Sequence, residues 1–185
     1  MRRSLLPDAD VNFYLDFRDL WSADRLPAAL AGEVLRAAVD LRRAKADPAT
    51  QRLLQGRNIA LLCEEVDGSE EEDARLFSQA ASSLGARVAR VRPAEAGLLP
   101  GRDLRELARM LGRLYDAIEC EGMDEGVVGQ LAEHSGVPVF NGIGRRSHPT
   151  AAWAVRLDGR APGEAGDARE DREALIQSLL VGTLR

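Results

Sequence analysis

The feature that most constrains the fold is a regular alternation of short apolar runs with segments of helical spacing. The four apolar runs, each short enough for a buried strand, are 59–63, 88–91, 117–120 and 137–140. The helical segments between them are 74–84, 104–115 and 125–134. Strands joined by helical crossovers pair in parallel, so the pattern predicts an α/β fold: a three-layer, open parallel sheet of about four strands with helices on both faces.

Two further helices flank this pattern. One runs from about 22 to 46, with Pro27 near its start. The other covers 168–184 and carries an apolar stripe that must be buried, so we expect it to pack back on the body. Glycine, proline and charged residues dominate 157–167, which is typical of a linker. The sequence therefore divides into a main domain at 1–156, this linker, and a closing helix at 168–185.

Composition narrows the class of protein. A chain of 185 residues with 45% hydrophobic content can form one well-filled core. The net charge of -5 argues against a nucleic-acid partner or an anionic membrane surface, and no apolar stretch is long enough to span a bilayer. Cys63 and Cys120 end two apolar runs without metal-site spacing, as expected of buried thiols in a reducing compartment. We therefore expect a cytoplasmic protein with no metal and no cofactor.

An acidic segment follows the first predicted strand, at the place where helix N-termini in α/β folds attract anions. It reads Asp67, Gly68, Ser69, Glu70, Glu71, Glu72 and Asp73. It could bind a divalent cation or a basic partner. The alternative is a solvated loop whose carboxylates stabilise the N-terminus of a helix beginning near Ala74. The spacing favours this alternative, because Gly68 comes too early for a calcium loop.

Two motifs carry a family resemblance. The segment 101–111 reads GRDLRELARML, similar to G-E-S-I-K-D-T-A-R-V-L, and 135–143 reads SGVPVFNGI, similar to S-V-P-V-W-N-G-L. His148, Pro149 and Thr150 then match the start of H-P-T-Q. Over about 13–154, the chain resembles the carbamoyl-phosphate-binding domain of the aspartate/ornithine carbamoyltransferase family, nearest to its ornithine branch. The last helix resembles the family's closing helix, which returns from a second, amino-acid-binding domain to the first. The resemblance implies that the linker at 157–167 replaces this second domain.

The resemblance also implies which functional positions have changed. The family's phosphate loop, S-T-R-T-R, falls within the acidic segment, where no arginine occurs before Arg75. A later family arginine corresponds to Glu121, and the glutamine of H-P-T-Q corresponds to Ala151. Each charge-assisted contact to phosphate contributes roughly 1.5–3 kcal/mol, so losing two or more lowers affinity by several powers of ten. Carbamoyl phosphate is therefore expected to bind weakly or not at all in the inherited manner.

The remaining candidate residues have two interpretations each. His148 could polarise a carbonyl oxygen, as the resemblance implies, or could be retained by packing at a helix start. Ser69 and Thr150 could contribute to a remodelled cleft. A relocated anion site could form from Arg102, Arg105, Arg145 and Arg146. The arginine-rich composition favours the alternative that these arginines are solvent-exposed side chains.

Two hypotheses about function follow. The first is an ornithine carbamoyltransferase-like protein that lacks the amino-acid-binding domain and has no catalytic activity. The resemblance implies a homotrimer or a mixed oligomer with a carbamoyltransferase, in a structural or regulatory role. The second is a small-ligand-binding protein or transferase that uses His148 in a cleft lined by acidic residues. Glu119 and Glu121 add negative charge at the edge of the sheet where ligands of open α/β folds bind.

Overall fold

The computed structural model describes residues 13–21, 27–63, 68–96, 103–157 and 168–185. Its centre is a parallel sheet with the strand order β2-β1-β3-β4. The strands are β1 (Asn58–Leu62), β2 (Arg87–Val91), β3 (Ala117–Cys120) and β4 (Val139–Phe140). In the register, Leu62 of β1 pairs with Val91 of β2 on one side and with Cys120 of β3 on the other. The predicted four-stranded parallel sheet is confirmed.

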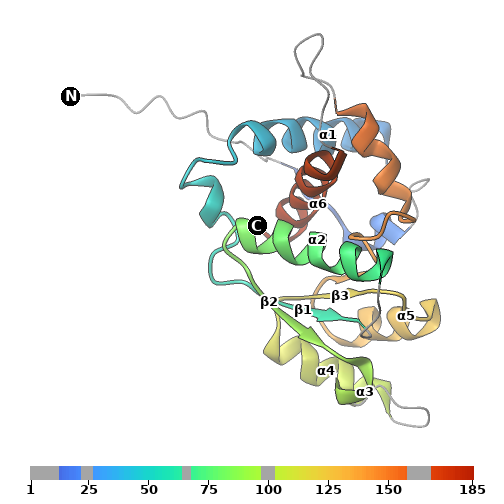
Figure 1. Cartoon of the computed structure of the whole chain (residues 1–185). Coiled ribbons are helices and arrows are strands. Elements are labelled where there is room, and N and C mark those ends of the chain that lie inside the picture. Colours follow the sequence, from blue (N-terminus) through green and yellow to red (C-terminus); the bar gives the residue numbers. More distant parts are fainter. Residues whose placement is uncertain (1–12, 22–26, 64–67, 97–102, 158–167) are drawn as a thin grey trace.

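Helices cover both faces of this sheet (Figure 1). The longer helices are α1 (Ala28–Arg43), α2 (Ser69–Ser83), α4 (Leu104–Leu114), α5 (Glu125–His134) and α6 (Ala168–Leu184). Figure 1 shows α2, α6 and α1 stacked over one face and α4 over the other, and α5 packs against α4. Right-handed crossovers require this division, because the chain moves outward from β1 to β2 but back across β1 to reach β3.

The core lies between the two helical layers. In β1 every residue from Ile59 to Leu62 is fully buried, and all of β3 is buried as well. Central strands that are covered on both faces have continuous apolar runs rather than alternating ones, and this is the pattern that the sequence shows. β4 is the shortest strand, but Ile118 still donates a hydrogen bond to the carbonyl of Pro138, directly before it. All four strands begin and end within two residues of their predicted positions.

The closing helix α6 packs back on the body, as predicted. Its burial is more complete than one apolar stripe suggests, because α1, α2 and the 3₁₀ helix η4 (Pro149–Arg156) surround it. The N-terminal segment closes the remaining side: Leu15 donates a backbone hydrogen bond to Gly182, and a Cβ at Gly182 would lie 2.5 Å from the Phe13 ring. Apart from Leu157, the predicted linker at 157–167 lies outside the described residues.

Helix boundaries differ from the prediction at one important point. α2 begins at Ser69, not near Ala74, so the carboxylates of 70–73 belong to its first turns and not to a preceding loop. Glutamate is a good helix former, and its charge is favourable near a helix N-terminus. Among the described residues, three short helices were not predicted, η1 (Phe17–Trp21), η3 (Thr50–Arg52) and α3 (Pro93–Ala96), whereas η4 begins after His148, where a helix start was considered. Within the described segments, no helix combines the length and apolar character needed to cross a bilayer.

The start of α5 offers a test of local stability. Asp124 is the N-cap, and its carboxylate accepts hydrogen bonds from the backbone of Gly126 at 2.9 Å and Val127 at 3.2 Å. We expect Asp124→Ala to lower the free energy of unfolding by about 1 kcal/mol, because two helix N–H groups lose their acceptor. Asp124→Asn, which keeps an acceptor oxygen, should cost only a few tenths. Urea denaturation of the three proteins checks this, and equal losses in both variants would contradict it.

Candidate functional site

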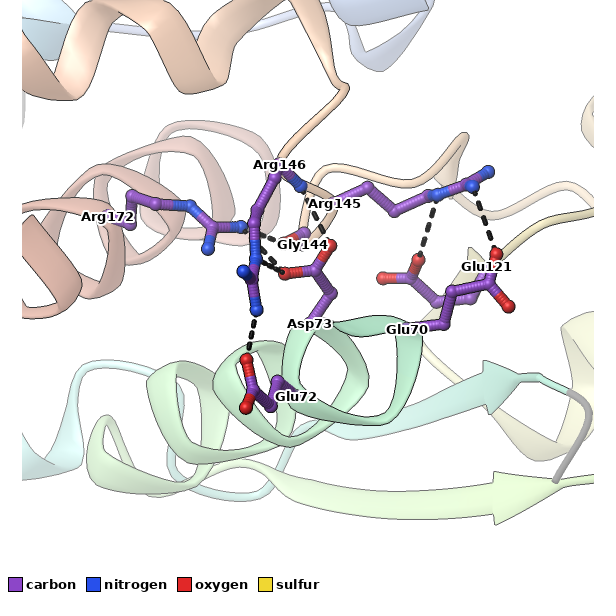
Figure 2. Close-up of polar contacts among 8 residues, drawn as sticks. All are labelled: Glu70, Glu72, Asp73, Glu121, Gly144, Arg145, Arg146 and Arg172. Carbon is purple, nitrogen blue, oxygen red and sulfur yellow. Dashed lines mark hydrogen bonds and ion pairs between the residues drawn. The ribbon is translucent and has the colours of Figure 1, made fainter. Parts of the chain in front are cut away.

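The candidate site lies at the carboxyl edge of the sheet, between β1 and β3. After β1 the chain leads to α2 on one face, whereas after β3 it leads to α5, which packs with α4 of the other layer. In open α/β sheets, the point where successive connections diverge in this way is the usual ligand site. Here the segment that follows β4, Gly142–Arg146, lies against the N-terminal end of α2 (Figure 2). We call it the 142–146 segment.

The N-terminus of α2 carries its own negative charge. Gly68 precedes the helix with φ 78° and ψ -134°, a backbone conformation that favours glycine. Ser69 is the first helical residue, and Glu70, Glu71 and Glu72 form the first turn. Asp67 lies outside the described residues. The position where the helix dipole would stabilise a bound anion is therefore surrounded by carboxylates of the same chain.

Asp73 is the central carboxylate of the site and is only 6% exposed. It accepts a hydrogen bond from the backbone of Arg146 at 2.9 Å and another from Arg146 Nε at 3.1 Å. Arg172 of α6 approaches the same carboxylate at 3.3 Å and donates to the carbonyl oxygen of Gly144 at 2.6 Å (Figure 2). Asp73 thus joins α2, the 142–146 segment and the closing helix.

The neighbouring glutamates also contact arginines of this chain. Arg146 forms a second ion pair with Glu72. Arg145 extends over the edge of the sheet, with Nη2 3.5 Å from Glu70 and Nε 4.0 Å from Glu121 (Figure 2).

Glu71 faces β2 instead. It bonds Arg90 at 2.6 Å and Arg75 at 2.8 Å, and these two guanidinium groups lower the pKa of Glu71 to about 2. Each acidic residue of α2 from Glu70 to Asp73 therefore has an arginine partner within the chain. Arg146 is solvent-exposed and Arg145 is half-buried, and both side chains are paired with these carboxylates.

A second acidic group lies under the 142–146 segment. Glu119 is fully buried at the end of β3, where its Oε1 accepts a hydrogen bond from the backbone of Gly144 at 3.2 Å. Glu121, two residues further on, has a side chain only 8% exposed. Burial raises the pKa of Glu119 well above its usual value, and the charge of Glu121 adds to the effect. Burial likewise raises the pKa of Glu121 to about 7.

His148 caps η4 and is buried. Its Nδ1 accepts a hydrogen bond from the backbone of Thr150 at 3.2 Å and lies 2.8 Å from the Thr150 hydroxyl oxygen. Burial lowers the pKa of His148 to about 4, while the backbone of Leu20 acts in the opposite direction. At neutral pH the imidazole is therefore uncharged, and with Nδ1 as acceptor the ring proton is on Nε2. The ring is only 7% exposed, so its geometry is that of a buried helix cap.

The structure brings some of the predicted residues together and separates others. Arg145 and Arg146 meet the first turns of α2, whereas Arg105 lies in the first turn of α4 in the other helical layer, and Arg102 lies outside the described residues. Ala151 follows Thr150 in η4. Among the described residues, no group of three or more His, Cys, Asp and Glu side chains is arranged to hold a metal ion.

Two residues of the site were not identified from the sequence in their observed roles. Arg172 was predicted only as part of the closing helix, although its charge lies within an otherwise buried stretch. Glu119 was predicted only to add negative charge at the edge of the sheet, and the structure shows that it is completely buried. The sequence did contain an indication of this burial, because Glu119 lies inside an apolar strand between Ile118 and Cys120, where a charged residue is unusual.

Comparison with known proteins identifies the family. A family model described as the carbamoyl-P binding domain of aspartate/ornithine carbamoyltransferase matches residues 18–154. The chain belongs to this family. It is 41% identical over 115 residues to an ornithine carbamoyltransferase of Actinobacillus pleuropneumoniae, covering 62% of this chain and 34% of the relative. It is 39% identical over 144 residues to a catabolic ornithine carbamoyltransferase of Burkholderia mallei, covering 78% and 42%. The chain thus spans less than half the length of these relatives.

Solved structures agree with the fold. An ornithine carbamoyltransferase from Pyrococcus furiosus superposes with a TM-score of 0.63 at 25% identity, over 78% of this chain and 45% of the other. An aspartate transcarbamoylase from Trypanosoma cruzi in complex with phosphate gives a TM-score of 0.57 at 22% identity, over 75% and 43%. The resemblance to the ornithine branch of the family is therefore confirmed, and so is the architecture of its first domain.

Proposed function

We propose that this chain is a carbamoyltransferase-like domain that does not catalyse carbamoyl transfer and that acts as a cytoplasmic subunit of an oligomer. The observation that carries the proposal is the set of ion pairs at the N-terminus of α2. Arg145, Arg146 and Arg172 all point toward the helix end where an anion would bind, and all three are bound to carboxylates of the chain itself. Carboxylates of the chain therefore take the place that a bound anion would have beside these arginines.

Displacement of these carboxylates by a phosphate is unfavourable. Arg146 would have to leave Asp73, whose carboxylate is 8% exposed and would then remain buried without that partner. Asp73 would keep only Arg172 as a charged partner, and the loss of the other partner from a buried carboxylate offsets part of the gain from arginine contacts with a phosphate. The remaining carboxylates of α2 would also repel a dianion. These charges therefore support weak or absent binding of carbamoyl phosphate.

The environment of His148 supports the same conclusion. Polarising a substrate carbonyl requires a ring nitrogen that faces the substrate. Here Nδ1 is engaged by Thr150, and Nε2, which has no hydrogen-bond partner among the described residues, is buried with the rest of the residue. The alternative hypothesis of a transferase that uses His148 needs a rearrangement of η4 to expose the ring. Glu121 and Ala151, at positions where the family resemblance implies substrate-binding residues, supply neither a positive charge nor an amide.

Ligand binding provides a direct test. In differential scanning fluorimetry, we expect carbamoyl phosphate and inorganic phosphate at millimolar concentration to leave the melting temperature unchanged within about 1 °C, because neither ligand finds available arginines. A catalytically competent ornithine carbamoyltransferase serves as the positive control. Citrulline formation by the purified chain would overturn the proposal. Stabilisation by a polyamine or a divalent cation would instead favour the hypothesis of a ligand-binding protein with an acidic cleft.

Assembly is tested separately. The family resemblance leads us to propose a homotrimer, or a mixed oligomer with a full-length carbamoyltransferase, as the functional form. Light scattering over a range of concentrations gives the mass of the chain alone. Co-expression with a tagged ornithine carbamoyltransferase then reports mixed assembly. A chain that stays monomeric and does not associate with the enzyme would contradict a structural or regulatory role of this kind.

A further inference from the structure

The carboxyl edge of the sheet contains two acidic groups that the proposed function does not use. Glu119 lies in β3 and Glu121 directly follows the strand, and their side chains are close enough to share a hydrogen bond. Among the described residues, nothing donates a hydrogen bond to Glu119 Oε2 or to Glu121 Oε1 when both groups are ionised. A proton on either carboxyl would allow the pair to form its own hydrogen bond. Two neighbouring buried carboxylates cannot both carry a charge without a large electrostatic cost.

The 142–146 segment is what covers the pair. The backbone N–H of Gly144 bonds Glu119, and a Cβ at Gly144 would lie 2.7 Å from Glu121 Oε1, 2.9 Å from Phe77 Cβ and 3.2 Å from the Asp73 carbonyl oxygen. Only glycine fits this close approach. Two contacts fix the segment in place. Arg172 of α6 donates a hydrogen bond to the Gly144 carbonyl oxygen, and Arg146, at the end of the segment, donates to Asp73. Lifting the segment would admit water to both carboxyls.

Three charged groups and one neutral thiol face the pair. Asp73 of α2 disfavours ionisation of Glu121, whereas Arg145 of the segment and Arg172 of α6 favour it. The thiol of Cys120, within β3, is itself held neutral by burial and by the two glutamates. Burial is the largest influence on the pKa of both carboxyls, and at Glu121 it outweighs the opposing effect of the two arginines. The covered pair therefore binds protons more tightly than hydrated carboxyls do.

We propose that the Glu119–Glu121 pair and the 142–146 segment form a pH-sensitive latch at the carboxyl edge of the sheet. The latch is closed while the pair holds its protons, and it opens as the protons leave. Because proton binding and closure are linked, each must favour the other to the same extent. A rise in pH through 7 consequently loosens the segment that carries Arg145 and Arg146. This inference concerns a property of the domain and does not depend on the proposed loss of catalysis.

Hydrogen exchange of the full chain tests the latch. For an ordinary amide in the EX2 regime, the logarithm of the exchange rate rises with pH with a slope of about 1. Each proton released on opening adds about 1 to the slope. We therefore expect a slope of about 2 to 3 between pH 5.5 and 7 for the amides of Gly144 and Arg146. The amide of Ile118, which is bonded within the sheet, should exchange more slowly and independently of the segment.

Glutamine variants show whether the two glutamates cause the steep dependence of the exchange rate on pH. We expect Glu119→Gln and Glu121→Gln each to lower it by about 1, and the double variant to restore a slope of about 1. The matched control is Glu106→Gln, an exposed glutamate on α4, which should leave the slope unchanged. If either single variant fails to fold, the other still decides the question. A wild-type slope of 1, a steep slope that persists in the double variant, or identical exchange in the segment and the sheet would overturn the proposal.

Discussion

Asp73→Ala is expected to lower the free energy of unfolding by about 3–5 kcal/mol, the largest loss that we predict for a single side chain of the site. Asp73 is almost completely buried and accepts hydrogen bonds from the backbone and side chain of Arg146 and from Arg172. Its removal leaves the guanidinium of Arg172, with a side chain 18% exposed, beside a cavity without a compensating charge. The same substitution releases the 142–146 segment from α2.

The matched control for this prediction is Glu72→Gln. Glu72 contacts the same arginine, but its side chain is 66% exposed, so its ion pair is worth less than about 1 kcal/mol. Urea denaturation near pH 7 should give a much lower midpoint for Asp73→Ala than for Glu72→Gln, with similar m values. A double-mutant cycle with Arg172→Met should show a coupling energy of about 1 kcal/mol or more. Equal losses in the two single variants would show that Asp73 does not organise the site.

Much of the fold follows from local patterns in the sequence. The four strands and α5 fall within two residues of their predicted positions, because apolar runs and helix caps such as Asp124 are local signals. The start of α2 was placed too late, since a run of four acidic residues was interpreted as a loop. In the structure the helix dipole and the arginines stabilise these charges within the helix itself. Those arginines are distant in sequence, so their effect could not be predicted from the segment alone.

The candidate site shows the same limit more clearly. The sequence predicts where carboxylates and arginines lie along the chain, and it places His148 correctly at a helix start. It does not predict that Arg145 and Arg146 meet α2, because 72 or more residues separate these positions and only the β-sheet topology brings them together. It also does not show that the His148 ring is buried or that Glu119 is covered by Gly144. These contacts depend on tertiary packing.

The last prediction is that the stability of the folded chain decreases as pH rises from about 5 to 8. An unfolded glutamate has a pKa near 4.5, whereas in the folded chain Glu121 has a pKa of about 7 and Glu119 one well above its usual value. Over this range the folded chain holds more protons than the unfolded chain, so raising the pH favours unfolding. Between pH 5 and 7 the loss amounts to about 3 kcal/mol per carboxyl at most. Below pH 4.5 the opposite trend should appear, because Glu71, with its lowered pKa, then takes up protons more readily in the unfolded chain.

Glu119→Gln tests this origin directly. The amide is neutral at every pH, its oxygen can still accept the hydrogen bond of Gly144, and its NH₂ group can donate to Glu121. We expect the variant to be about as stable as the wild type at pH 5 and more stable than it at pH 8, because unfolding no longer releases a proton from position 119. Urea denaturation at intervals of half a pH unit measures the difference, with Glu106→Gln as the control for a general change in charge. A Glu119→Gln variant that is less stable than the wild type at pH 8 would contradict a protonated Glu119 as the origin of the pH dependence.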